Sequence, residues 1–368
     1  MHKNSVLAIA LLVGTIVGAG IFSLPYVISR VGLVRGIFYF IFFAAVYLVI
    51  HRMYADLLLK TDESHQFFYV ARTYLPRFFA NLVSGGVFLE LVFVMTIYLI
   101  LAPSFLKLVA DIPTGYLVIG FWALGSFFML ARLSWVGWAE FLGVFSIIGA
   151  VGAIVWMGAG KSLEFSTPSL TGWLGFVLPF GPLLFAFSGR PAIGEVVKTW
   201  RKSEREHSPF SLPRAIFWGT VIPVILYFVF VVGILTLPPS PSIDAVAGLG
   251  FLPSGALLAL GTLGFFALWT SYFIIGINLR DTLREDLKAP NVAAYAVPWI
   301  FPLLLYFAGV NHFLSAVSFT GSVLLGMEGA AIAFMWRKAF PAHPYRWIAI
   351  PLILVFAVAI ISGVVKIF

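Results

Sequence analysis

Two stretches that interrupt long apolar segments decide the fold of this chain. The first is VGTIVGAGIFSLPY at residues 13–26, which has three glycines in seven residues and Pro25 shortly after them. Glycine carries a high entropy cost inside a helix, and proline removes a backbone hydrogen bond, so a continuous helix is unfavourable here. Taken alone, the pattern fits close packing of two helices through small residues equally well.

The second stretch is LPFGPLLFAFSGRPAIGE at residues 178–195, with three prolines, three glycines and the charged residues Arg190 and Glu195. Irregular backbone at membrane depth persists only where it is buried in protein or lines a wet cavity. Broken helices at matching positions in two halves of a chain are the best sequence indication of a transporter site. The two breaks, near residues 19 and 188, therefore predict transport.

The composition places both stretches in a membrane. The chain has 368 residues, of which 61% are hydrophobic and 10% charged, and its mean hydropathy is +1.03. A water-soluble globular fold cannot bury so much apolar surface, and the long continuous runs are unlike the short alternating strands of a barrel. The absence of cysteine excludes disulfides, thiolate metal sites and cysteine nucleophiles.

Apolar runs of about 20 residues predict an all-α polytopic protein with about 11 transmembrane helices in one transporter domain, residues 1–368. Most basic residues fall in loops on the side of the N-terminus, which predicts a cytoplasmic N-terminus and an outside C-terminus in the cell membrane. The net charge of +8 reflects these loops and gives no indication of a nucleic-acid partner. Residues 66–79 are amphipathic and are expected on the cytoplasmic surface. The predicted spans are 5–28, 33–58, 81–107, 116–131, 137–160, 174–199, 214–237, 253–279, 293–308, 312–336 and 346–366.

The spans divide into two predicted repeats, each of which begins with a broken helix. Five spans cover 5–160 and the next five cover 174–337. Because each repeat has an odd number of spans, the second is inverted relative to the first. Residues 346–366 form an extra helix 11.

The broken helices and a third motif resemble the amino acid–polyamine–organocation superfamily, whose LeuT-type fold is a five-plus-five inverted repeat with broken helices 1 and 6. GAGIF at 18–22, followed by LPY at 24–26, is similar to the helix 1 signature. FAFSG at 185–189 with PAI at 191–193 resembles helix 6 of the amino acid/auxin permease and hydroxy/aromatic amino acid permease branches. TSYF at 270–273 is similar to their helix 8. The branches often have histidine where this chain has Arg190 and proline where it has Gly194, which leaves substrate charge and ion coupling open.

Helix ends inside the membrane offer backbone groups that suit an amino acid zwitterion. A helix that restarts presents free N–H groups and a positive dipole end to a carboxylate, and a helix that stops presents carbonyls to an ammonium group. Glycines at the break let the substrate approach the backbone. The predicted ligands are the N–H groups of Ala19, Gly20 and Ile21, and the carbonyls of Thr15, Ile16, Phe185, Ala186 and Ser188, with Gly18 and Gly20 giving access.

Three aromatic side chains are the candidates for the rest of the substrate site. Tyr98 on the third span is placed to bond the carboxylate or cap the pocket, and Phe185 and Phe187 to form an apolar wall. These walls predict a large neutral or aromatic amino acid as substrate. Since aromatics make up 17% of the chain, packing or lipid contact is the alternative for each.

Two groups of residues are candidates for cation coupling. Thr270 and Ser271 offer hydroxyls that, with helix 1 carbonyls, suit a sodium ion in the resembling fold; local bonds to carbonyls of the preceding turn are the alternative. Glu90 and Glu328 are intramembrane carboxylates and hence candidate proton carriers. Glu195 is expected in a structural pair with Arg190 or Lys198.

The sequence therefore predicts a secondary active amino acid transporter that couples to Na⁺ or H⁺ and works by alternating access. It predicts no enzyme, since no His is followed by Glu and no G-x-S-G string occurs. No other cofactor or metal is expected. The expected partners are the small-molecule substrate and the lipid bilayer, and the protein is expected to be a monomer. A passive channel, or a facilitator or exchanger for small organic solutes, is the alternative.

Overall fold

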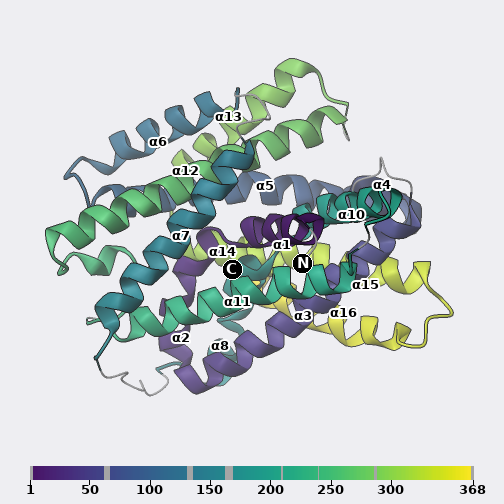
Figure 1. Cartoon of the computed structure of the whole chain (residues 1–368), viewed down its shortest axis with the longest axis horizontal. Helices are drawn as coiled ribbons and strands as arrows, with labels where there is room; N and C mark the ends of the chain where they lie inside the picture. The colour runs from purple at the N-terminus through teal and green to yellow at the C-terminus, as the bar shows by residue number, and fades with distance from the viewer. Residues whose placement is uncertain are drawn as a thin grey trace.

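The computed structural model describes residues 3–61, 67–130, 136–161, 169–208, 210–238, 240–285 and 288–365. Every regular element in these ranges is helical (Figure 1). The first half contains α1 (Lys3–Ile16), η1 (Ala19–Ser23), α2 (Leu24–Val31), α3 (Leu33–Lys60), α4 (Phe67–Tyr74), α5 (Arg77–Leu106), α6 (Thr114–Phe128) and α7 (Val136–Gly158). The second half contains α8 (Gly172–Val177), α9 (Phe180–Phe187), α10 (Arg190–Arg205), α11 (Leu212–Leu235), η3 (Ala247–Leu249), α12 (Ser254–Glu285), α13 (Asn291–Phe307), α14 (Phe313–Phe319), η4 (Thr320–Leu324), α15 (Leu325–Ala339), η5 (Arg346–Ile348) and α16 (Ala349–Val365).

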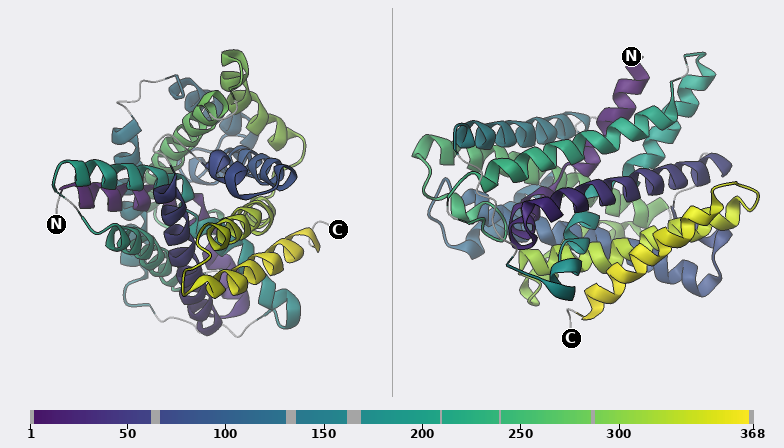
Figure 2. Two further views of the ribbon diagram at one scale, coloured as in Figure 1. Left: turned by 90° about the vertical axis from the view of Figure 1, so that its right-hand side faces the viewer. Right: turned by 90° about the horizontal axis from the view of Figure 1, so that it is seen from below.

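The helices form one bundle (Figure 2). Within the described residues, seven helical stretches are long and apolar enough to cross a membrane, one of them being Gly172–Arg205, which comprises α8, α9 and α10. An eighth span is a bent pair in which Asn4–Ile16 and Ala19–Val31 meet at 45°. Three shorter apolar helices, Thr114–Phe128, Leu142–Gly158 and Asn291–Phe307, lie where the fourth, fifth and ninth spans are predicted. The all-α polytopic membrane fold is confirmed, and the count of eleven spans stays a prediction.

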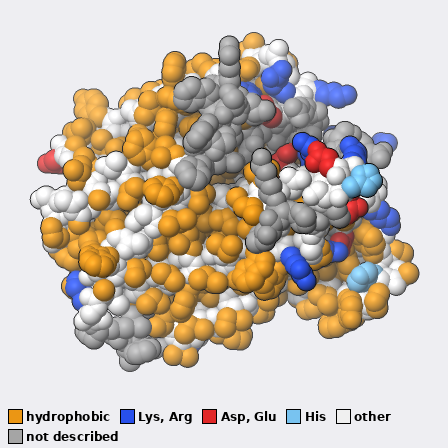
Figure 3. Space-filling view, in the orientation of Figure 1, with side chains coloured by type: hydrophobic (Ala, Val, Ile, Leu, Met, Phe, Trp, Pro, Cys, Tyr) orange, Lys and Arg blue, Asp and Glu red, His pale blue; other side chains and the backbone are white. Residues whose placement is uncertain are grey.

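The outer surface matches a protein surrounded by lipid. Figure 3 shows hydrophobic side chains over most of the face and charged side chains gathered at its right-hand end, where Figure 1 places α4 and α10. Large apolar residues point outward all along the bundle, among them Phe38, Trp156 and Val292. An exposed apolar surface of this extent requires a hydrocarbon environment.

The first predicted break is present. Helix α1 ends at Ile16, and the chain is extended at Gly18, with φ −153° and ψ −155°. A short 3₁₀ helix, η1, then leads into α2, which has Pro25 in its first turn, where the missing N–H of proline removes no helical hydrogen bond. The glycines therefore end helix α1, and Pro25 favours the start of helix α2.

The second predicted break lies at Ser188 and Gly189. Helix α9 ends at Phe187 and α10 begins at Arg190, again with a proline, Pro191, in its first turn. The two broken spans lie against each other, because α1 packs against α10 and η1 packs against α9. The long helix α5 packs against η1 of this pair and, on another side, against the long helix α12.

The amphipathic segment before the third span forms helix α4, which packs against α5 and α15. Its residues Phe67, Phe68, Val70 and Ala71 are buried, whereas Arg72 is exposed at the surface. The predicted amphipathic pattern is present over α4, whereas residues 77–79 already belong to α5, and the cytoplasmic location stays a prediction. Residue 66 lies outside the described residues.

Candidate functional site

The two helix breaks touch each other at Gly20 and Ala186. A Cβ atom placed on Gly20 would lie 2.6 Å from the Cα of Ala186, a distance that real side chains do not tolerate. The φ angle of Gly20 is not in the positive range, so the requirement for glycine comes from this close approach and not from backbone conformation. In this conformation α9 occupies the space that we expected the substrate to use.

A tyrosine from α11 closes the first break. The hydroxyl of Tyr227 donates a hydrogen bond to the carbonyl of Ile16 at 2.5 Å and accepts one from the N–H of Gly18 at 3.1 Å. Tyr227 is fully buried. Tyr227 is not among the residues predicted from the sequence, although a tyrosine hydroxyl in the middle of an apolar span needs a polar partner and is a usable signal.

Tyr98 reaches the same break from α5, and its predicted contact with a substrate stays a prediction. Its hydroxyl is so close to Gly18 that a Cβ there would lie 2.9 Å away. Ser271 and the backbone of Ala19 lie close to the same hydroxyl. Two tyrosine hydroxyls thus lie at the break, and that of Tyr227 bonds backbone groups that a helix break leaves without intrahelical partners.

The other predicted substrate residues divide into three groups. Ile16, Gly18, Ala19, Gly20, Tyr98 and Ala186 come together where the breaks meet. Thr15, Phe185 and Ser188 are half-buried beside them. Ile21 and Phe187 are fully buried, and Phe187 packs between Phe40 at 5.6 Å and Tyr227 at 6.1 Å between ring centroids.

The two hydroxyls of helix α12 face different neighbours. Thr270 donates to the carbonyls of Phe266 at 2.9 Å and Ala267 at 3.1 Å, which is the local bonding that we weighed against a sodium site. It also lies against Gly143 of α7. Ser271 is directed instead toward Tyr98 and the first break. The structure therefore brings Ser271, and not Thr270, toward helix 1.

The two candidate proton carriers lie together around Arg190 at the start of α10. The guanidinium Nε of Arg190 is 2.5 Å from Oε2 of Glu328, and Nη2 is 3.7 Å from Oε2 of Glu90. The exposed fractions of the three side chains are 11% for Arg190, 6% for Glu90 and 5% for Glu328. The ring of Phe67 covers the guanidinium at 5.1 Å. Helices α5, α10 and α15, together with α4, thus enclose a buried ionic cluster.

Glu195 does not belong to this cluster. It pairs with Lys198, one turn further along α10, at 2.7 Å, and both side chains are more than half exposed. This is one of the two structural pairs that we expected. Within the described residues, His, Cys, Asp and Glu side chains do not gather in threes in a way that could hold a metal ion.

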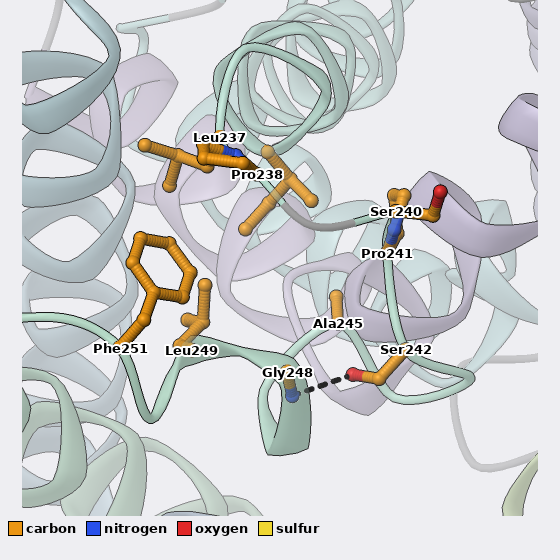
Figure 4. Close-up of a pocket in the computed structure, with 10 residues that line it drawn as sticks. Leu237, Pro238, Ser240, Pro241, Ser242, Ala245, Gly248, Leu249 and Phe251 are labelled. Carbon is orange, nitrogen blue, oxygen red and sulfur yellow. Dashed lines mark hydrogen bonds between the residues drawn. The ribbon is translucent and has the colours of Figure 1, made fainter.

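Two pockets in the structure lie away from the breaks. One, of about 340 Å³, is a surface hollow lined by Arg72, Arg77 and Asn81. The other is small and lies between the end of α11 and the loop before α12, where Ser242 accepts a hydrogen bond from the N–H of Gly248 (Figure 4). The breaks themselves are closed by the tyrosine hydroxyls and by the contact between Gly20 and Ala186.

Comparison with known protein families identifies the family of this chain. The sequence model of the family described as transmembrane amino acid transporter proteins matches residues 2–236. This chain belongs to that family. Among the curated proteins, none matches the sequence of this family member.

The fold is shared with solved transporter structures. The Eremococcus coleocola manganese transporter in complex with an aromatic bis-isothiourea substituted compound has a TM-score of 0.58 and 13% identity, over 98% of this chain and 85% of that one. The structure of a mutant of the same manganese transporter gives a TM-score of 0.55 and 12% identity with the same coverage. At these identities the likeness establishes the fold alone.

Proposed function

We propose that this member of the transmembrane amino acid transporter family is a secondary active transporter that binds amino acids where the two helix breaks meet. The observation that carries the proposal is the closure of the first break by Tyr98 and Tyr227. The Tyr227 hydroxyl bonds a free carbonyl and a free N–H group, which are the kinds of group that an ammonium and a carboxylate require, and the Tyr98 hydroxyl lies against the same break.

Binding in this scheme is an exchange of hydrogen bonds. When the break opens, the Tyr227 hydroxyl releases the carbonyl of Ile16, which then accepts from the substrate ammonium group. The N–H groups of Ala19, Gly20 and Ile21 donate to the carboxylate. Because a zwitterion replaces both kinds of bond, the buried backbone groups stay satisfied, and leaving them unpaired would be costly. A solute with only one of the two charges would leave half of them without partners.

The surroundings of the break favour a neutral side chain on the substrate, in keeping with a large neutral or aromatic amino acid. Arg190 follows the second break directly, but Glu328 neutralises it, so it is not free to attract an acidic side chain. The side chains next to the break are aromatic, with Phe187 stacked on Tyr227 and Phe185 half-buried beside it. The proposed movement is alternating access driven by a cation gradient.

The proposal includes the arrangement in the membrane. The N-terminus lies in the cytoplasm, the C-terminus lies outside, and the monomer acts in the cell membrane. The repeats are residues 5–160 and 174–337. The gathering of charged side chains at the end of the bundle that holds α4 and α10 supports a cytoplasmic location for that end (Figure 3).

Reconstitution in lipid vesicles tests the proposal. We expect saturable uptake of phenylalanine or leucine and counterflow when the same amino acid is loaded inside. Flux that rises linearly with concentration and shows no counterflow would identify a channel instead. Saturable uptake and counterflow with no response to a sodium or proton gradient would identify a facilitator or exchanger.

A further inference from the structure

The ionic cluster at Arg190 contains one more acidic group than basic groups. Arg190 comes from α10, Glu328 from α15 and Glu90 from α5, and all three side chains are almost fully buried. If all three were ionised, the cluster would carry a net negative charge inside the membrane-spanning bundle. An uncompensated charge at that depth is strongly disfavoured, so one carboxyl group must carry a proton.

The geometry distinguishes the two carboxyl groups. Glu328 receives the short bond from Nε of Arg190 at 2.5 Å and is the counter-ion of the guanidinium. Glu90 lies 3.7 Å from the same guanidinium, beyond hydrogen-bond distance, and its buried Oε2 atom has no hydrogen-bond partner. The two carboxyl groups are close enough for their negative charges to repel. The proton therefore belongs on Glu90.

The groups around Glu90 do not include a second cation that could balance a negative charge on its carboxyl group. Glu328 faces it from α15, Arg190 from α10 and Tyr47 from α3. The Tyr47 hydroxyl donates a hydrogen bond to the carbonyl of Leu184, and α4 contributes the uncharged ring of Phe67 over the guanidinium. Tyr54 of α3 is a further neighbour of the Arg190 guanidinium. In the described part of the chain, the ion pairs of Glu90 involve Arg190 alone.

We propose that Glu90 is the proton-binding residue of this transporter and that it stays uncharged in the closed conformation beside a fixed Arg190–Glu328 ion pair. The inference rests on the proposed function, because it names the coupling ion of that transport. The step is a simple ionisation: the O–H bond of Glu90 breaks, the proton passes to water that enters when the bundle opens, and a carboxylate remains.

Arg190 links this step to the helix break. The carboxylate formed on Glu90 attracts the guanidinium that is already 3.7 Å away. Arg190 is the first residue of α10 and follows the break at Ser188 and Gly189 directly. A shift of the guanidinium toward Glu90 therefore moves the half-helix that borders the proposed substrate site. Loss and gain of one proton on α5 would in this way alter the position of α10.

Infrared spectroscopy of the purified full-length protein at neutral pH tests the location of the proton without transport. We expect the carbonyl stretching band of a buried protonated carboxyl group in the wild type and its loss in Glu90→Gln. We expect the band to be lost also in Glu328→Gln, because Glu90 then becomes the ionised partner of Arg190. The matched control Glu195→Gln, which changes an exposed and salt-bridged carboxylate, should keep the band. An unchanged band in Glu90→Gln, or a retained band in Glu328→Gln, would overturn the proposal.

Uptake into vesicles at zero sodium tests the coupling. We expect an inward proton gradient to raise amino acid accumulation by the wild type and by Glu195→Gln, whereas accumulation by Glu90→Gln should fall to the level measured without a gradient. Accumulation by Glu90→Gln that still follows the proton gradient would overturn the assignment. If the wild type transports no amino acid under any gradient, the proposed function fails, and the infrared measurement still decides where the proton is bound.

Discussion

The hydroxyl of Tyr227 donates to the carbonyl of Ile16, 211 positions earlier in the chain, and so ties α11 to the end of α1. The same oxygen accepts from the N–H of Gly18 on the other side of the break. One side chain thereby holds both edges of the interruption. The closed break depends on a side chain from another helix, because its own backbone cannot satisfy these groups.

Replacement of Tyr227 by Phe keeps the ring and removes both hydrogen bonds. Each is worth about 0.5–1.5 kcal/mol to the closed conformation. We expect a lower melting temperature without ligand and a larger stabilisation by substrate, since the substrate no longer competes with the hydroxyl. Thermal unfolding in detergent with increasing amino acid concentration measures both effects. The exposed Tyr116→Phe on α6 is the control, and identical curves for Tyr227→Phe and the wild type would contradict the role of Tyr227.

The contact between Gly20 and Ala186 predicts that Gly20→Ala abolishes transport. The added Cβ would lie 2.6 Å from the Cα and 2.9 Å from the Cβ of Ala186, so the two breaks must separate. We expect a loss of uptake and a lower melting temperature. Gly85→Ala on α5 is the matched control, because a Cβ there meets nothing within 4 Å and should leave stability equal or higher by about 0.5–1 kcal/mol. Wild-type uptake by Gly20→Ala would show that the breaks do not need this contact.

Replacement of Arg190, the positively charged residue of the buried cluster, is expected to change the pH dependence of stability. In Arg190→Gln, the buried Glu328 loses its counter-ion, and we expect a loss of about 3–5 kcal/mol near neutral pH. The folded variant then holds more protons than its unfolded state, so its stability should rise as the pH is lowered. Melting temperatures between neutral and acidic pH measure this slope.

The double variant Arg190→Gln with Glu328→Gln is the control for that experiment. It leaves Glu90 as the single acidic group of the cluster, and this group can remain protonated, so much of the lost stability should return. A stability of Arg190→Gln that equals the wild type at every pH would mean that the cluster carries no buried charge.

A second buried polar contact joins α3 to α11. His51 is buried, and its Nδ1 lies 3.0 Å from the hydroxyl of Thr220. Replacement of Thr220 by Val keeps the shape and leaves the histidine without this partner. We expect a destabilisation of about 1–3 kcal/mol. Thr73→Val on the exposed face of α4 is the control in the same melting assay, and a Thr220→Val protein as stable as the control would refute the prediction.

The breaks could be predicted from the sequence because they are local. Gly18, Gly20 and Pro25 alter the backbone where they stand, and so do Gly189 and Pro191, whatever surrounds them. The pair of Glu195 and Lys198 could also be predicted from the sequence, since residues three apart face each other on a helix.

The partners of Arg190 and Tyr227 could not be predicted in this way. Glu328 is 138 positions from Arg190, and only the packing of α10 against its neighbours selects it over other acidic residues. The hydroxyls of Thr270 and Ser271 are adjacent in sequence, yet one faces α7 and the other the break, because successive helical residues point in different directions.

The measurement that tests the central claim most directly is binding by amino acids in which one charged group is blocked. Thermal stabilisation of the purified protein is recorded with phenylalanine, its methyl ester and its N-acetyl derivative. If the breaks bind a zwitterion, phenylalanine at about 100 times its Kd stabilises the protein by about 2.7 kcal/mol, and neither derivative does so at that concentration. Equal stabilisation by all three compounds would contradict recognition of the two charged groups by the backbone of the helix breaks.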